Sequence, residues 1–230
     1  MSGNESVQPD ECARADQRNE TGWEAGEIGC TDNDWCDPDH CSPILIDFSG
    51  DLFQLSGAAE PVHFDIDGDG SRRAIGWTRR NSDDAFLCLD RNRNGQIDSG
   101  AELFGTATRL SNGDLAANGY EAMAELDRPE HGGNADGVLS AEDAAFRKLC
   151  IWRDQNRDGV SQKVEMESLI LSGVLELGLD YSDHPHLDAD NNLLLFHGGA
   201  IVSRDGVPAF VRTVDVFFSA VDRPQRPGSR

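Results

Sequence analysis

The stretch DQNRDGVSQKVE, residues 154–165, carries oxygen-bearing side chains at the spacing of an EF-hand calcium loop. In this pattern the first, third and fifth side chains point inward, a glycine at the sixth position allows a sharp turn, and an acid at the twelfth closes the shell. The alternative is a plain polar turn, but the complete match favours calcium. The expected ligands are Asp154, Asn156, Asp158, the main-chain carbonyl of Val160, and Glu165.

A second stretch, DRNRNGQIDSGAE at residues 90–102, repeats the pattern with a displaced closing acid. The twelfth position is Ala101, and the acid follows one residue later as Glu102. Calcium takes about six to eight oxygens in a flexible geometry and tolerates this shift better than magnesium does. The expected ligands are Asp90, Asn92, Asn94, the carbonyl of Gln96, and Glu102.

A third stretch, DIDGDG at residues 65–70, has only the first half of the pattern. The twelfth position is Gly76, so the closing acid must come from another segment. Asp83 or Asp84 is the candidate, because a hairpin would return either residue to the loop; an Asp-Gly turn without an ion is the alternative. The expected ligands are Asp65, Asp67, Asp69 and the carbonyl of Ser71.

A fourth loop contains NADG at residues 134–137 and is counted from Gly132, which has no side chain. Asp127 would supply the missing oxygen if residues 128–132 bulge out. The expected ligands are Asn134, Asp136 and Asp143. A fifth stretch, DFSGDL at residues 47–52, has Leu52 in place of the glycine, and we expect it not to bind an ion.

The charge of the chain favours cations as partners. Asp and Glu total 42 against 20 Lys and Arg, which gives a net charge of -22 and argues against nucleic acid and anionic membranes. No apolar run approaches the roughly 20 residues of a membrane span. About two to four calcium ions are therefore the expected partners. The sequence identifies no protein or surface partner.

The predicted fold class is α+β, with short antiparallel strands and a few helices linked by EF-hand-like calcium loops. Helices are expected after Asn118, after Ser140 as a capping box with Asp143, and over residues 162–172. Strands are expected over residues 43–48, 62–66, 74–78, 85–90, 174–179, 192–196, 200–203 and 209–218. The last strands are separated by expected turns at Gly198-Gly199 and Asp205-Gly206.

Composition divides the chain into three parts: a Cys-rich polar leader over residues 1–41, the calcium-binding module over 42–221, and a disordered tail over 222–230. In the leader, Cys30, Cys36 and Cys41 either form disulfides or bind zinc with a histidine; the absence of a Cys-x2-Cys spacing favours disulfides. Cys88 and Cys150 lie in apolar runs, as free thiols or as one bridge.

Six motifs occur in a characteristic order: SPILIDF (42–48), FDIDGDG (64–70), LDRN (89–92), ELFG (102–105), NGYEA (118–122) and IWRDQNRDGVSQ (151–162). In residue identity and in order they resemble the calcium-dependent self-processing module of repeat-in-toxin proteins and related secreted bacterial calcium-binding proteins. The resemblance implies an exported or cell-surface module that is loose without calcium and compact with it. Residues 1–42 contain no signal-peptide hydrophobic stretch.

The self-processing members of that family cleave an Asp-Pro bond at the start of the module through an anhydride of the aspartate. The matching bond here is Ser42-Pro43, and serine cannot form that anhydride. We therefore expect a calcium-binding, calcium-stabilised extracellular module without catalytic activity, in a structural or interaction role. The alternative is calcium-triggered self-cleavage at Asp37-Pro38.

Overall fold

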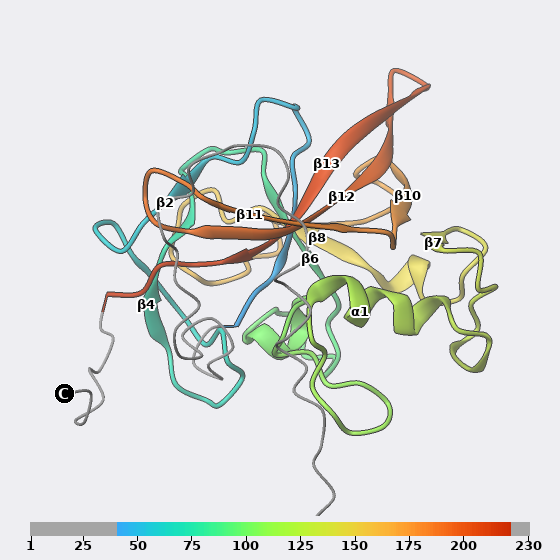
Figure 1. The fold of residues 1–230 in the computed structure, drawn as a ribbon, viewed down its shortest axis with the longest axis horizontal. Coiled ribbons are helices and arrows are strands. Elements are labelled where there is room, and N and C mark those ends of the chain that lie inside the picture. Colours follow the sequence, from blue (N-terminus) through green and yellow to red (C-terminus); the bar gives the residue numbers. More distant parts are fainter. Residues whose placement is uncertain (1–40, 222–230) are drawn as a thin grey trace, which may run out of the picture. The chain divides into compact units, whose positions relative to one another are not determined.

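A nine-stranded antiparallel sheet dominates the structure, a computed structural model that describes residues 41–221 (Figure 1). The strand order is β7-β10-β12-β13-β1-β6-β8-β9, and β11 also pairs with β12. The bounds are β1 Ile44–Ile46, β6 Ala85–Cys88, β7 Val138–Ser140, β8 Cys150–Trp152, β9 Met166–Ser168, β10 Val174–Gly178, β11 Ser182–Leu187, β12 Leu193–Arg204 and β13 Val207–Phe217. Two small sheets pair β2 (Leu55–Ser56) with β5 (Trp77–Thr78) and β3 (Val62–Phe64) with β4 (Arg73–Ile75).

The central strands β1 and β6 are buried on both faces. Because side chains alternate along a strand, Ile44, Ile46 and Leu87 point into one core while Leu45 and Phe86 point into the other. The first core also contains helix α1, and the second contains the two small sheets. The sheet therefore lies between two apolar layers.

The predicted α+β class is wrong, because the described residues are mostly β-structure with a single α-helix, α1 (Gly119–Ala124). Asn118 caps α1 by accepting the N–H of Glu121, as predicted. None of the predicted calcium loops is flanked by two α-helices, so the EF-hand-like helices are absent from residues 41–221. In this range no helix is long and apolar enough to cross a membrane. The short 3₁₀ helices are Gly100–Glu102, Glu125–Asp127, Pro129–His131 and Phe146–Lys148.

Two predicted helices are replaced by other structure. The Asp143 carboxylate accepts the N–H of Ser140 at 2.7 Å, but only a 3₁₀ turn follows. Residues 162–172 form β9 and turns, with Val164 94% and Leu171 77% exposed. Leu169 of this stretch is buried in the first core, but Val164 and Leu171 face away from it, so no continuous apolar face supports a helix.

The predicted turn at Gly198-Gly199 is also wrong, because β12 continues through both glycines. A Cβ atom at Gly198 would lie 2.7 Å from the Tyr120 ring, and one at Gly199 would overlap the Phe210 ring. The glycines make room for aromatic packing. The predicted Asp205-Gly206 turn is confirmed, with φ angles of 52° and 81°.

Of the cysteines, Cys41, Cys88 and Cys150 fall within the described residues, and Cys88 and Cys150 are free thiols. Cys88 and Cys150 are register partners on β6 and β8 and are not bridged, so of the two alternatives that the sequence left open the free thiols are found. The rest of the Cys-rich leader and the predicted tail lie outside the described residues.

Asp215 on β13 connects the sheet to the start of α1. It is fully buried, and it accepts the Gly119 N–H at 2.6 Å. Burial raises the pKa of Asp215 to about 7, against the opposing effects of that N–H and the Ser42 hydroxyl. The carboxyl therefore binds its proton more tightly in the folded chain than in the unfolded one.

This raised pKa predicts a pH dependence of stability. The contribution of Asp215 is fully present below its unfolded pKa of about 4 and is lost as the pH rises through about 7. Relative to Asp215→Asn, the wild-type chain should lose about 2 to 4 kcal/mol of unfolding free energy between pH 4 and pH 8. Urea unfolding of both chains in calcium measures this. A constant difference across the range would show that the pKa is not raised.

Candidate metal centres

The Asp154 loop, residues 154–165, connects β8 to β9 and holds its first and last carboxylates inward. Asp154 accepts the N–H of Asp158 at 3.2 Å and that of Gly159 at 2.9 Å. Glu165 accepts the N–H of Gln155 at 3.1 Å with one oxygen and that of Gln162 at 3.4 Å with the other. The carboxylates of the first and twelfth residues therefore both point toward the main chain of the loop.

These two acids are buried without a basic partner. Asp154 is 2% and Glu165 8% exposed, and neither makes an ion pair within residues 41–221. Burial raises the pKa of Asp154, and repulsion from Glu165 adds to this. The indole N–H of Trp77 donates to Asp154 at 2.9 Å, but this donor is neutral and does not balance the charge of a carboxylate. Within residues 41–221 no basic side chain therefore balances these two acids.

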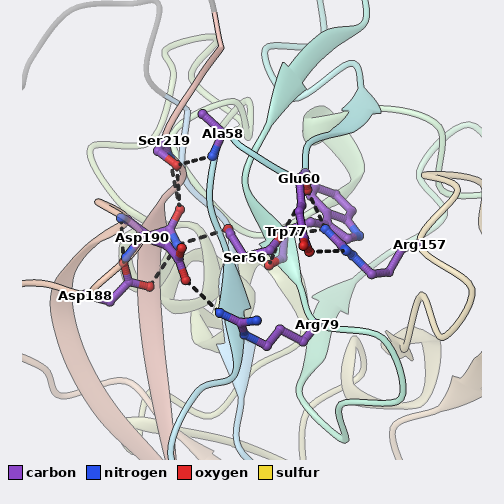
Figure 2. A network of polar contacts seen from close by, with 10 residues as sticks. Ser56, Ala58, Glu60, Trp77, Arg79, Arg157, Asp188, Asp190 and Ser219 are labelled. Atoms are coloured by element: carbon purple, nitrogen blue, oxygen red, sulfur yellow. Dashed lines mark hydrogen bonds and ion pairs between the residues drawn. The ribbon is translucent and has the colours of Figure 1, made fainter.

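The arginine inside the loop points away from it. Arg157 donates to the Ser56 hydroxyl at 2.6 Å and to the Glu60 carboxylate at 3.3 Å (Figure 2). The same figure shows a turn whose acids are already satisfied, where Arg79 contacts Asp190 at 2.8 Å. Acidic turns in this fold therefore differ: some have protein cations, and the Asp154 loop does not.

The same hydrogen bond recurs in the other predicted loops. The glycine at the sixth position donates its N–H to the first aspartate, from Gly95 to Asp90 and from Gly70 to Asp65, each at 2.9 Å. Both this position and the fourth lie in the left-handed region. The φ angles are 67° and 86° for Gly68 and Gly70, 61° and 81° for Arg93 and Gly95, 59° and 88° for Ala135 and Gly137, and 62° and 66° for Arg157 and Gly159.

In the Asp90 loop, residues 90–102, Glu102 makes the contacts that the twelfth residue makes in the Asp154 loop. Glu102 accepts the N–H of Asn92 at 3.3 Å with one oxygen and that of Asp98 at 3.1 Å with the other. Glu165 accepts from the third and ninth positions in the same way. Glu102 is 3% exposed, and burial raises its pKa. The geometry places Glu102 where the stretched spacing predicted it.

Whether Glu102 closes the loop in place of the twelfth residue, Ala101, can be tested. For the calcium binding that is proposed below, Glu102→Gln should reduce the affinity of this loop at least tenfold, because it removes a buried charge from the closing position. Ala101→Glu, which restores the twelfth acid, should bring no gain because Glu102 already occupies the space. Calcium titration calorimetry compares the two variants. Rescue of the first variant by the second change would mean that the loop closes through residue 101.

The Asp127 loop, residues 127–143, contains the predicted bulge. Asp127 accepts the Gly137 N–H at 3.0 Å, as the first aspartates of the other loops accept from their glycines. The 3₁₀ helix Pro129–His131 forms the insertion. Asp143 is 1% exposed, and its Oδ1 is buried without a hydrogen-bond partner in the described part of the chain. Such an oxygen is available to an ion.

The Asp65 loop, residues 65–71, differs because Arg73, which follows it on β4, pairs with two of its acids. The Arg73 guanidinium contacts the Asp67 carboxylate and lies 2.9 Å from Asp69. Asp83 and Asp84, proposed to close this loop, contact residues 47–54 instead. Of the four loops, this is thus the one whose acids pair with a protein cation within residues 41–221, although Oδ1 of Asp67 is buried there without a hydrogen-bond partner.

Neighbouring loops contact one another. The Ile97 N–H donates to the Ser161 hydroxyl at 2.6 Å, which joins the eighth positions of the Asp90 and Asp154 loops. Gly100 donates to the Asp65 carbonyl at 2.7 Å. Three loops therefore form one continuous region beside the second core.

Comparison with known proteins identifies the family. The sequence profile of the SPM domain matches residues 44–219. This chain belongs to the SPM domain family. This chain is also 39% identical over 169 residues to the iron-regulated protein FrpA of Neisseria meningitidis serogroup C. That alignment covers 73% of this chain but 14% of the relative, so the chain spans about a seventh of the relative's length.

The donor set of this SPM domain suits calcium better than zinc, since the loops offer oxygens only. No group of three His, Cys, Asp or Glu side chains is gathered for a metal within the described range. In the Asp154 loop, amide groups lie between the acids: Asn156 and Gln162 both donate to Asp158, at 2.9 and 2.6 Å. Rotating these amides would present their oxygens, which calcium binds.

Sequence reasoning missed two features of the SPM domain. The indole groups of Trp77 and Trp152 reach the loop acids from the second core, and no local spacing indicates them. The stretch at residues 47–52 was expected not to bind, yet Leu52 adopts a φ of 75°, the conformation of the missing glycine. The alternation of Asp47, Ser49 and Asp51 was the available signal.

Proposed function

We propose that this SPM domain is a calcium-binding module, stabilised by its ions and without catalytic activity of its own. The burial of Asp154 with Glu165, in the absence of an ion pair to either among residues 41–221, carries the proposal. Two buried carboxylates without a cation destabilise a fold, and calcium would reverse this. About two to four ions would occupy the Asp154, Asp90, Asp127 and Asp65 loops.

Binding should be coupled to folding, because the loops connect separate parts of the structure. The Asp154 loop joins β8 to β9, accepts a hydrogen bond from Trp77 of β5, and contacts Ile97 of the Asp90 loop. An ion that orders this loop therefore stabilises the sheet and the second core together. Dissociation constants of about 0.1 to 1 mM, as in extracellular modules, are expected.

The proposed setting is a bacterial exterior, as a secreted or cell-surface module in a structural or interaction role. The resemblance to calcium-dependent self-processing modules supports this, and extracellular calcium is in the proposed range of affinity. The partner, a protein or a surface, stays unidentified. Ser42 is the residue before Pro43 and is 1% exposed. Its N–H donates to the Thr106 hydroxyl at 3.0 Å, and its own hydroxyl accepts the Thr106 N–H at 3.3 Å.

Thermal melting followed by circular dichroism tests the proposal, first in EDTA and then in about 5 mM calcium. Calcium should raise the melting temperature by several degrees, magnesium should raise it less, and Asp154→Ala should reduce the calcium effect. A chain that melts identically in EDTA and calcium would contradict the proposal.

The same samples separate binding from self-cleavage at Asp37-Pro38, which lies outside the described residues. A denaturing gel of the calcium-treated chain should show a single band. Two fragments that disappear in Asp37→Ala would establish the cleaving alternative.

A further inference from the structure

The turn of the Asp154 loop, residues 157–159, packs against the β2–β3 segment, which comprises residues 56–63. A Cβ atom at Gly159 would lie 2.6 Å from the main-chain carbonyl of His63 and 2.9 Å from the Val62 side chain. No atom lies within 4 Å of the Cβ position at the corresponding glycines of the other three loops, Gly70, Gly95 and Gly137. The Asp154 loop is therefore the one of the four whose turn glycine lies directly on another part of the chain.

The Arg157 side chain holds the same turn against the β2–β3 segment. Its Nη2 donates to the Ser56 hydroxyl at 2.6 Å and to the Glu60 carbonyl at 2.5 Å, and its Nη1 donates to the Glu60 carboxylate at 3.3 Å (Figure 2). The side chain of Arg157 is 14% exposed, and that of Glu60 is 69% exposed. Because an ion pair with so exposed a carboxylate contributes little, most of the attachment comes from the hydroxyl and the carbonyl.

A second arginine has the same backbone conformation without these contacts. Arg157 is the fourth residue of its loop and has a φ of 62°, and Arg93 is the fourth residue of the Asp90 loop and has a φ of 61°. The left-handed region is unfavourable for a residue with a Cβ atom, so each arginine carries a conformational cost. Arg93 is exposed and forms no ion pair among residues 41–221. Arg93 is thus a matched control for Arg157.

Ser56 connects Arg157 to the ends of two long strands. The Ser56 carbonyl accepts the side-chain amide of Asn192, which is fully buried just before β12, at 3.2 Å. The side-chain oxygen of Asn192 accepts the N–H of Ser219, which follows β13, at 3.0 Å. The Ser219 hydroxyl in turn accepts the Ala58 N–H at 3.0 Å (Figure 2). The β2–β3 segment therefore contacts both the Asp154 loop and the main sheet.

Within its loop, Arg157 lies between two of the expected ligands, Asn156 and Asp158. The N–H of Asp158 also donates to Asp154 at 3.2 Å, so the main chain of the turn contacts the first acid as well. An ion that gathers these oxygens needs the turn in one conformation. A contact that holds this conformation before the ion arrives lowers the ordering cost of binding.

We propose that Arg157 is a positioning residue for the ion of the Asp154 loop, and that this ion in turn holds the β2–β3 segment in place. The two effects are reciprocal, because a contact that favours ion binding is itself favoured by the bound ion. The inference rests on the proposed function, since it requires an ion in the loop. The Asp90 loop, whose Arg93 is exposed, would bind its ion without this coupling.

Calcium titration calorimetry on the full chain compares Arg157→Gln with Arg93→Gln. Each substitution removes one positive charge from the fourth position of a loop, so any direct repulsion of the ion is relieved in both. Arg157→Gln should nevertheless weaken one calcium site about fivefold or more, whereas Arg93→Gln should weaken none. If the wild-type chain binds calcium and Arg157→Gln binds every ion as tightly, the positioning role is wrong and the proposed function stands. A wild-type chain that binds no calcium would contradict both.

A second variant approaches the contact from the other segment. Ser56→Ala removes the hydroxyl that accepts from Arg157, and it should weaken the same calcium site. Because both substitutions break one contact, their effects on affinity should be smaller together than their sum. Effects that add fully, or a Ser56→Ala chain with wild-type affinity, would overturn the assignment.

Hydrogen exchange followed by mass spectrometry separates positioning from general stabilisation. In saturating calcium, compared with EDTA, exchange in the β2–β3 segment should slow at least tenfold in the wild-type and Arg93→Gln chains and clearly less in Arg157→Gln. Exchange in β13 should respond to calcium alike in all three chains. Full protection of the β2–β3 segment in Arg157→Gln would overturn the coupling. A loss of protection by the same factor in both regions would show that Arg157 only stabilises the fold.

Discussion

Glu165→Gln is expected to lower the calcium affinity of the Asp154 loop at least tenfold. It should also lower the melting temperature in about 10 mM calcium by about 3 to 10 °C. In EDTA the same substitution should leave stability unchanged or raise it, because it removes a carboxylate that is 8% exposed and has no basic partner in the described structure. Thermal melts of both chains under both conditions measure this reversal.

Glu167→Gln is the matched control, two residues along on β9. Its carboxylate is 41% exposed and pairs with Arg153 at 3.2 Å, so its loss should cost about 0.5 kcal/mol or less in either solution. If the two variants behave alike in calcium, the Asp154 loop is a turn and not a metal site.

Gly105→Ala is expected to prevent folding or to cost more than about 4 kcal/mol, the largest structural effect that we predict. A Cβ atom at Gly105 would overlap the main-chain carbonyl of Ser42, and a backbone atom cannot move aside as a side chain can. Because Ile44 of β1 also donates to the Phe104 carbonyl at 2.7 Å, the displacement would reach the central strand. Urea unfolding in saturating calcium measures the loss.

Gly113→Ala separates this overlap from backbone strain. Gly113 has a φ of 94° and no atom within 4 Å of its Cβ position, so alanine there should cost about 1 to 2 kcal/mol. Equal losses in the two variants would show that the segment at Ser42 does not pack on Gly105.

The loops could be predicted from sequence because their geometry is local. The spacing of Asp, Asn and Gly determines the turn, and the displaced Glu102 and the bulge after Asp127 were both found in this way. The helices were predicted from capping residues beside apolar ones. The helix after Asn118 is confirmed, whereas only a 3₁₀ turn follows Ser140, and residues 162–172 form β9 and turns.

Non-local contacts could not be predicted. Asp83 and Asp84 were assigned to the Asp65 loop, but the pairing of Ile46 with Ala85 brings them to Asp47. That register depends on which strands share the two cores, and no local pattern contains it. The same holds for Trp77, which lies 77 residues from its partner Asp154.

The most direct test of the account is calcium titration calorimetry on the chelator-stripped full chain up to about 10 mM calcium. We predict saturable binding of more than one ion per chain, with dissociation constants of about 0.1 to 1 mM. A titration that shows only the heat of dilution over that range would contradict the central claim that calcium holds this fold together.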